Sequence, residues 1–207
     1  MMGMKLTELG LTREAEVSHL AVKEAVFPFD RFANVDTLLG PEMKSTGEVM
    51  GLDDSLGLAF AKSQLAAGQQ LPSHGNVLIS VRGADKPTIL PLALRLLALD
   101  FAILATSGTA EFLTKHNVDC TMVNKISQGR PHLLDMVQDN QVQWIINTSM
   151  GSRTTEDSYF IRRSALDYHI PYSTTATGAL SMVRALETVR EKKMQVKAIQ
   201  KYFNSDD

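Results

Sequence analysis

From residue 76 onward, short apolar runs alternate with segments in which apolar side chains recur every three or four residues. The runs predict strands and the recurring spacing predicts helices. The predicted strands are Asn76–Ser80, Phe101–Ala105, Thr121–Val123, Gln141–Ile146 and Ile170–Ser173. The predicted helices are Pro87–Leu99, Ala110–His116, Pro131–Asp139 with a proline in its first turn, Asp157–Tyr168, and Gly178–Glu187 continuing over Lys192–Tyr202.

This alternation predicts an α/β fold, a parallel five-stranded sheet with helices on both faces. The first part of the chain has another pattern. Ala21–Phe29 alternates as a strand does, prolines and glycines interrupt Leu39–Gly51, and Ser55–Leu65 has helical spacing. Ala67–Gly75 is rich in glycine, proline and small polar residues, which predicts a linker. One or two strands and a helix bury too little for a core. We therefore expect residues 1–70 to end a larger domain and residues 71–207 to form a second one.

Composition narrows the classes of function. A net charge of −2 over 207 residues provides no field that would attract nucleic acid or an anionic membrane, so neither is an expected partner. Leu90–Ala105 is the most apolar segment, but Arg95 and Asp100 interrupt it, which excludes a membrane span. The single cysteine, Cys120, predicts a small core residue in a reducing compartment. Met1–Lys5 lacks the apolar region of a secretory signal, so we expect a cytoplasmic protein.

Polar residues follow four of the five predicted strands. In a parallel sheet these strand ends meet at one edge, which is where ligands bind in open α/β sheets. Hydroxyls, an amide and a lysine together predict a pocket for a phosphorylated small molecule. The residues are Ser80, Thr106, Gly108, Thr109, Lys125, Asn147, Thr148 and Ser149.

The turn at residues 105–109 offers backbone N–H groups at the positive end of a helix, which suits a phosphate. A plain helix cap from Thr106 or Ser107 explains the same residues and is favoured from this turn alone. Lys86 and Lys125 fall at the same edge and provide point charges for phosphate, and Arg153 precedes a helix within reach of an anion.

Other polar residues are better explained by structure than by chemistry. His132 and Asp135 stand one turn apart and fit an acid–base pair, but local hydrogen bonds at a helix start are the favoured interpretation. Arg162 and Arg163 lie mid-helix, where salt bridges are common. No metal-ligand cluster, P-loop, nucleophile elbow or Cys/His pairing stands out. We therefore predict no metal site and no catalytic residue.

Several motifs resemble a known enzyme family. Leu39–Gly51, with Val22–Glu24 and Phe27–Phe29, resembles the end of the second ATP-grasp unit of the carbamoyl-phosphate synthase large subunit. Leu78–Leu186 resembles the allosteric domain that follows it, whose fold is shared with methylglyoxal synthase. The matching motifs are Ser80–Arg82, Ala105–Thr109, Val123–Lys125, Gly129–His132, Ile146–Thr148 and Ile161–Leu166.

The resemblance implies a regulatory segment of an enzyme that makes carbamoyl phosphate from bicarbonate, glutamine and ATP, for pyrimidine and arginine biosynthesis. ATP and Mg or Mn belong to the complete enzyme, so this segment alone is expected to hold no cofactor and to be non-catalytic. Its partners would be the remainder of the large subunit, the small glutaminase subunit and further copies of itself. UMP would inhibit and IMP would activate. The implied nucleotide site is Ser80, Lys86, Thr106, Thr109, Lys125, Asn147, Thr148, Ser149 and Arg153.

The resemblance also implies an ornithine site between the two parts of the chain, at Glu24, Leu39, Tyr172 and Thr174. The ornithine-responsive pattern has an aspartate where this sequence has Ser173, which removes a charge partner for the ligand's ammonium group.

Two alternatives stay open. One is a stand-alone lyase like methylglyoxal synthase, which needs a carboxylate base beside the phosphate site. The segment Ile126–His132 offers no such acid. The other is a structural module for self-association with a vestigial pocket.

Overall fold

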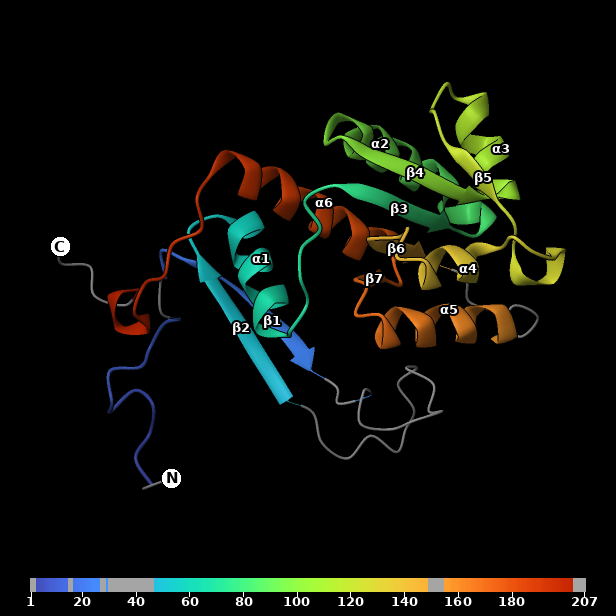
Figure 1. Ribbon diagram of the computed structural model, residues 1–207. Helices are drawn as coiled ribbons and strands as arrows, with labels where there is room; N and C mark the ends of the chain where they lie inside the picture. Colours follow the sequence, from blue (N-terminus) through green and yellow to red (C-terminus); the bar gives the residue numbers. More distant parts are fainter. Residues whose placement is uncertain (1–2, 15–16, 27–28, 30–46, 149–154, 203–207) are drawn as a thin grey trace.

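The described part of the protein contains two sheets joined by a connecting segment, residues 67–74 (Figure 1). The computed structural model describes residues 3–14, 17–26, 29, 47–148 and 155–202. A two-stranded sheet precedes the connecting segment and a five-stranded sheet follows it. That the first sheet ends an ATP-grasp domain, and that the boundary falls at residue 70, stay predictions.

The larger sheet has the order β5-β4-β3-β6-β7, and all of its pairings are parallel. The predicted five-stranded parallel sheet is therefore confirmed. The chain runs outward from the central strand on one side and then returns to fill the other side. The strands are β3 (Gly75–Ser80), β4 (Phe101–Thr106), β5 (Thr121–Val123), β6 (Trp144–Asn147) and β7 (Tyr172–Ser173).

Helices cover both faces of this sheet, as predicted. Side chains of β3 alternate between two cores, Val77 and Ile79 toward one and Leu78 toward the other, because successive residues of a strand point to opposite faces. The first core also contains residues of α2 (Lys86–Ala98), α3 (Ser107–Lys115) and α6 (Ala176–Glu191). The second contains residues of α4 (Leu133–Gln138) and α5 (Thr155–Asp167).

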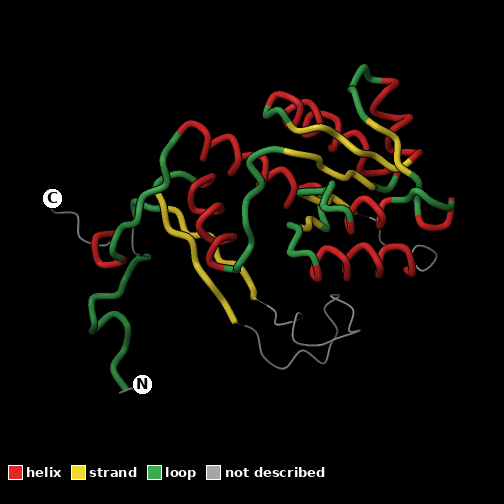
Figure 2. Tube along the Cα trace, viewed as in Figure 1, coloured by secondary structure: helices red, strands yellow, loops and turns green. Residues whose placement is uncertain are grey.

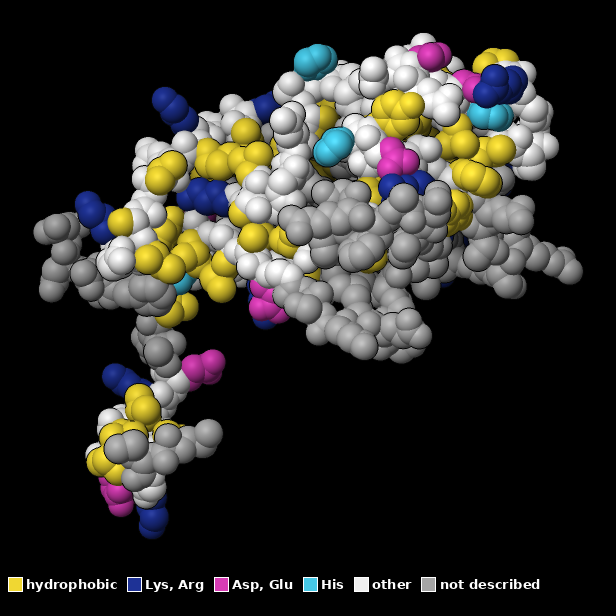
Figure 3. Space-filling model, turned by 60° about the horizontal axis from the view of Figure 1, so that its bottom comes forward, with side chains coloured by type: hydrophobic (Ala, Val, Ile, Leu, Met, Phe, Trp, Pro, Cys, Tyr) yellow, Lys and Arg dark blue, Asp and Glu magenta, His cyan; other side chains and the backbone are white. Residues whose placement is uncertain are grey.

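The smaller unit consists of antiparallel strands β1 (Leu20–Val26) and β2 (Gly47–Asp53), with α1 (Leu56–Ala66) packed on them (Figure 2). Helix α1 also packs against α6, which therefore touches both units. Apolar side chains gather on the surface at this end of the molecule (Figure 3). Those of the unit that are most exposed are Leu20, Met50, Leu56 and Leu65.

The expectation that the last helix continues to Tyr202 is wrong. Helix α6 ends at Glu191, and after residues without regular structure a short 3₁₀ turn, η4, covers Ile199–Tyr202. The Tyr202 hydroxyl donates to the Leu52 carbonyl at 2.9 Å and lies 3.3 Å from Lys62 Nζ. The C-terminal segment therefore leaves the helical path because it docks on the smaller unit.

Other element boundaries also differ from the predicted ones, and three of them concern the candidate site or its neighbouring strands. Helix α3 begins at Ser107 rather than Ala110, so the predicted turn is the helix's first turn. Helix α4 begins at Leu133 with His132 as its cap, and Pro131 precedes it. Strand β6 begins only at Trp144. The residue before it, Gln143, bonds to Asn76 through both its backbone N–H, at 2.9 Å, and its side-chain oxygen, at 2.7 Å.

Strand β2 was not predicted, because glycines at its positions weaken the strand pattern. The packing of α1 explains one of these glycines, Gly51. A Cβ at this position would run into the Ala59 carbonyl and the Ser63 amide of α1, so the close approach of helix to strand requires a glycine.

We predict that Gly51→Ala lowers the free energy of unfolding by about 2 kcal/mol, because α1 must move away from β2. Gly47→Ala is the matched control, since its Cβ would only reach Val26 at an ordinary 3.7 Å. It should change stability by less than about 0.5 kcal/mol. Urea unfolding measures both. Equal effects of the two substitutions would contradict the close packing.

Candidate functional site

The ends of the three central strands meet around Ser80. The Thr106 hydroxyl at the end of β4 donates to Ser80 Oγ at 3.2 Å. On the other side Asn147 pairs in register with Ser80, and Thr148 N–H donates to the Ser80 carbonyl at 3.3 Å. Thr106, Asn147 and Thr148 are all buried. The structure thus brings together four of the residues predicted from the sequence.

Two buried threonines hold the loop that leaves β3. Thr109, in the first turn of α3, accepts a hydrogen bond from Val81 N–H at 3.3 Å. Thr148, after β6, accepts one from the next N–H, that of Arg82, at 3.4 Å. The β3–α2 loop is therefore fastened from both neighbouring strands. Both hydroxyls have a structural task whether or not a ligand binds.

Lys86 reaches from α2 to the start of α3. Its ammonium donates to the Gly108 carbonyl at 2.5 Å and lies 6.0 Å from the centre of the Phe112 ring. A Cβ on Gly108 would lie 3.5 Å from Lys86 Nζ, so the charge sits directly over the first helical turn. A lysine at the positive end of a helix dipole concentrates positive potential there, which suits an anion.

Thr106 occupies the cap position of α3 but its side chain does not cap the helix. Its hydroxyl is turned to Ser80 instead. The interpretation of Thr106 as a side-chain cap is therefore wrong, because the hydroxyl is satisfied across the sheet edge rather than along its own helix.

Lys125 lies farther along the same edge. Val123, the last residue of β5, pairs in register with Thr106. Lys125 comes two residues after Val123, beyond the end of the strand. It is half-buried, and its N–H donates to Gln128 Oε1 at 2.8 Å at the start of a 3₁₀ turn. Ser149 and Arg153 lie outside the described residues.

Asp85 is a charged residue of this edge that the sequence did not indicate. Arg82 Nε donates to Asp85 Oδ2 at 2.7 Å, and a second guanidinium nitrogen donates to Oδ1 at 3.3 Å. Hydrogen bonds from Arg82 and from the Thr148 hydroxyl lower the pKa of the Asp85 carboxyl. The only signal in the sequence was an arginine three residues before an aspartate.

His132 and Asp135 form a helix cap, as favoured from the sequence. His132 N–H donates to Asp135 Oδ2 at 2.8 Å, and His132 Nδ1 accepts from Asp135 N–H at 3.4 Å. Arg130 adds an ion pair to Asp135 at 3.2 Å. The Asp135 carboxylate is thus already bonded on both oxygens. Elsewhere, Arg163 forms the expected helical salt bridge, with Asp167 at 2.8 Å.

The predicted ornithine residues are distributed over both sheets. Glu24 lies on β1 and accepts from Gln64 Nε2 of α1 at 3.0 Å, while Tyr172 lies on β7 and Thr174 just after it. Ser173, which replaces the expected aspartate, accepts from the buried Trp144 indole N–H at 3.2 Å. This serine therefore has a structural role. Leu39 lies outside the described residues.

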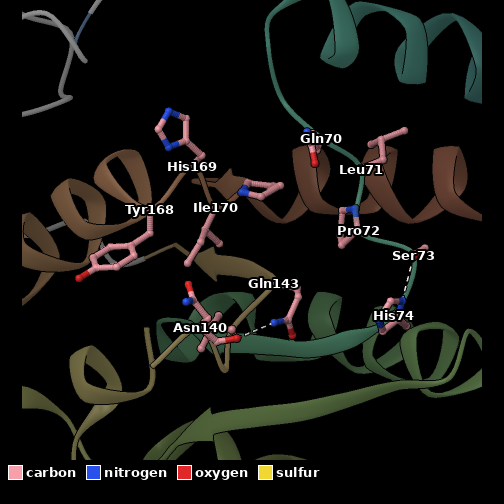
Figure 4. A pocket seen from close by; sticks show the side chains of 12 residues that line it. Gln70, Leu71, Pro72, Ser73, His74, Asn140, Gln143, Tyr168, His169 and Ile170 are labelled. Carbon is pink, nitrogen blue, oxygen red and sulfur yellow. Dashed lines mark hydrogen bonds between the residues drawn. The ribbon is translucent and has the colours of Figure 1, made fainter. Parts of the chain in front are cut away.

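A surface hollow of about 340 Å³ lies at the opposite, amino-terminal edge of the larger sheet (Figure 4). It is lined by the connecting segment, including Ser73 and His74, and by residues around Gln143 and His169. The Gln143 amide is committed to Asn76 N–H and to the Asn140 carbonyl. None of the predicted site residues that the structure describes lines it, so this hollow is separate from the described part of the candidate site.

Within the described part of the chain, no group of His, Cys, Asp and Glu side chains is suited to hold a metal ion. No described helix is long and apolar enough to cross a membrane. Cys120 is half-buried and packs against the first core.

Comparison with known proteins agrees with the motifs. Residues 88–174 match the MGS-like domain. The chain is 51% identical over 98% of its length to the carbamoyl phosphate synthase large chain of Archaeoglobus fulgidus. It is 48% identical, again over 98% of its length, to the one of Myxococcus xanthus. In both cases it covers 19% of the relative, so it spans about a fifth of the curated proteins it matches.

Among solved structures, the chain is similar to methylglyoxal synthase from Elizabethkingia anophelis NUHP1. The TM-score is 0.45 and the identity 15%, over 55% of this chain and 79% of that one.

We predict that Thr109→Val lowers the free energy of unfolding by about 2 kcal/mol, because it leaves the Val81 N–H without its acceptor. Thr114→Val changes an exposed threonine of the same helix and should cost less than about 0.5 kcal/mol. Urea unfolding of both variants tests this. A Thr109→Val protein as stable as the control would show that the hydroxyl does not hold the loop.

A second prediction concerns Glu24. Burial raises the pKa of its carboxyl above the ordinary value, and the hydrogen bond from Gln64 offsets this only in part. Above the ordinary pKa the folded state therefore holds more protons than the unfolded state, so stability falls as pH rises through the raised pKa. Glu24→Gln should remove this fall and gain stability relative to wild type between about pH 4 and neutrality.

Thermal unfolding across this pH range measures the effect. Glu48→Gln removes an exposed carboxylate of the neighbouring strand, paired with Lys23, and serves as control. Its difference from wild type should stay within about 0.5 kcal/mol. A Glu24→Gln variant that loses stability toward neutral pH would contradict the burial argument.

Proposed function

We propose that this chain, which belongs to the carbamoyl phosphate synthase large-chain family and carries an MGS-like domain, binds a nucleoside monophosphate at the carboxyl edge of its five-stranded sheet. Binding there would regulate carbamoyl phosphate synthesis by the complete enzyme. The observation that carries this proposal is the Lys86 ammonium held over the first turn of α3. The relatives bear the enzyme's name, and the chain covers about a fifth of each.

The phosphate would sit at the start of α3. Backbone N–H groups of the first turn point toward an anion at a helix N-terminus, and Lys86 supplies a formal charge beside them. The Thr109 hydroxyl accepts from Val81 and keeps its own proton, which is available to a phosphate oxygen. Lys125 would supply a second charge from β5. These groups support a phosphomonoester over a neutral ligand.

The nucleoside would extend toward the junction of β3 and β6. Ser80 and Asn147 are paired there in register and offer a hydroxyl and an amide. An amide both donates and accepts, so it suits the edge of a base or a ribose. Ser149 and Arg153 belong to the same proposal. UMP as inhibitor and IMP as activator are the proposed effectors, and ornithine a proposed activator at Glu24, Leu39, Tyr172 and Thr174.

Regulation requires a ligand that prefers one arrangement of the enzyme over another. Helix α6 supports such a role because it covers the larger sheet and packs on α1 of the smaller unit. The proposed partners are the remainder of the large subunit, the small glutaminase subunit and further copies of this chain. ATP and Mg or Mn would act in the complete enzyme, which uses bicarbonate and glutamine.

The alternative of a lyase needs a carboxylate that removes a carbon-bound proton. The two candidates near the site are already engaged, Asp85 by Arg82 and Asp135 by His132 and Arg130. The lowered pKa of Asp85 also makes it a weak base. We therefore expect no turnover of dihydroxyacetone phosphate, an assay that separates the two functions.

Calorimetric titration with UMP and IMP tests the proposal. Lys86→Met should weaken binding about tenfold or more, because it removes the charged donor over α3. Lys115→Met is the control. It removes one positive charge from the last turn of α3, far from its first turn, and should leave the affinity nearly unchanged. Saturable binding with this contrast supports the proposal. No binding by folded wild-type chain, or equal loss in both variants, would refute it.

A further inference from the structure

Asp85 is an anion at the edge of a site proposed to bind another anion. It ends the 3₁₀ turn η2 (Gly83–Asp85) directly before Lys86, the first residue of α2. Its side chain is 18% exposed, whereas that of Arg82 is 55% exposed. A fixed carboxylate repels phosphate unless its own charge is neutralised or it moves away.

The donors around Asp85 are ones that phosphate would also use. Arg82 gives it two hydrogen bonds, in the forked geometry that guanidinium forms with carboxylates and phosphates alike. Thr148 lies beside the same loop, since its hydroxyl accepts from Arg82 N–H at 3.4 Å. The Arg82 guanidinium can pair with a nucleotide phosphate in this forked geometry only when Asp85 releases it.

We propose that Asp85 is a resident anion that holds the Arg82 guanidinium beside the nucleotide site, and that the phosphorylated effector displaces it. The inference rests on the proposed function and adds a regulatory device to the same site. The carboxylate holds the guanidinium through two hydrogen bonds. Effector and Asp85 then exclude one another at this guanidinium.

The loop that carries Asp85 has room to rearrange. A Cβ added to Gly83 would meet no atom within 4 Å, and Arg82, Gly83 and Ala84 are exposed. Asp85 directly precedes Lys86, the first residue of α2. Movement of Asp85 away from Arg82 therefore alters the start of this helix, where Lys86 is proposed to bind the phosphate. Displacement of Asp85 and engagement of Lys86 are thereby linked, because one peptide bond joins the two residues.

The test is a double-mutant cycle in the 207-residue chain, read by calorimetric titration with UMP and IMP. Asp85→Asn should strengthen binding about fivefold, because it removes a like charge and frees the Arg82 guanidinium. Arg82→Ala should weaken binding, since it leaves the carboxylate uncompensated. The double variant should return close to wild type, because the two charges cancel in the wild-type protein and are both absent in the variant.

Asp100→Asn is the matched control. It also removes an aspartate paired with an arginine, Arg190 at 3.3 Å, but at the opposite edge of the sheet. Asn tolerates the left-handed backbone there, where φ is 58°. The Asp100→Asn variant should bind UMP and IMP with the affinity of wild type. Melting temperatures of all variants identify any that are unfolded, and Asp85→Glu, which restores the charge, should lose the gain.

The outcomes separate the two proposals. Nucleotide binding by wild type with equal or weaker binding by Asp85→Asn overturns the resident anion and leaves the proposed function intact. An equal gain in Asp100→Asn also overturns it, because long-range charge would then explain the effect. Binding by Asp85→Asn but not by wild type also overturns displacement, because the effector would then be unable to remove the carboxylate from Arg82. Failure of every folded variant to bind refutes both proposals.

Discussion

The central strand β3 is hydrogen-bonded on both sides, and this double pairing organises the site. Its neighbour β4 follows directly in the chain, whereas β6 arrives only after the chain has passed through the edge strand β5. The winding direction therefore reverses between β3 and β6. Loops at such a reversal diverge and leave space at the carboxyl edge for a ligand. Ser80 and Asn147 face one another in register at this junction.

Burial of the strands on both faces makes the hydroxyl groups at their ends depend on one another. Thr106, Thr109 and Thr148 are nearly inaccessible, and a buried hydroxyl without a partner is costly. Each finds its partner on a neighbouring segment: Ser80, Val81 and Arg82 in turn. The hydroxyl groups at the carboxyl edge of the sheet, which suit a ligand, therefore also stabilise the loops there. A ligand that takes the Thr106 proton must replace the bond to Ser80, so binding and local rearrangement are coupled there.

The apolar runs placed β3 and β4 within a residue of their observed bounds, because a strand buried on both faces leaves a strong signal in the sequence. The edge strand β5 was also placed correctly, although Thr121 and Met122 are exposed. The start of α3 was missed because Ser107 and Gly108 have turn-like composition, although Lys86 bonds across this helical turn. The contact between Trp144 and Ser173 depends on strand register. The bonds of Asp85 depend on a 3₁₀ turn. Neither periodicity nor composition encodes contacts of that kind.

The site and the smaller unit are joined by contiguous packing. Lys86 begins α2, and farther along that helix Arg95 Nε donates to Glu187 of α6 at 2.7 Å. One residue beyond Glu187, Thr188 lies so close to Gly57 of α1 that a Cβ there would clash with it. Contiguity alone does not establish coupling, which needs two arrangements of different energy and a ligand that favours one. If a phosphate displaced Asp85 at the start of α2, the ligand would favour one arrangement of that helix. Helix α2 is the first element in the series of contacts that leads through α6 to α1.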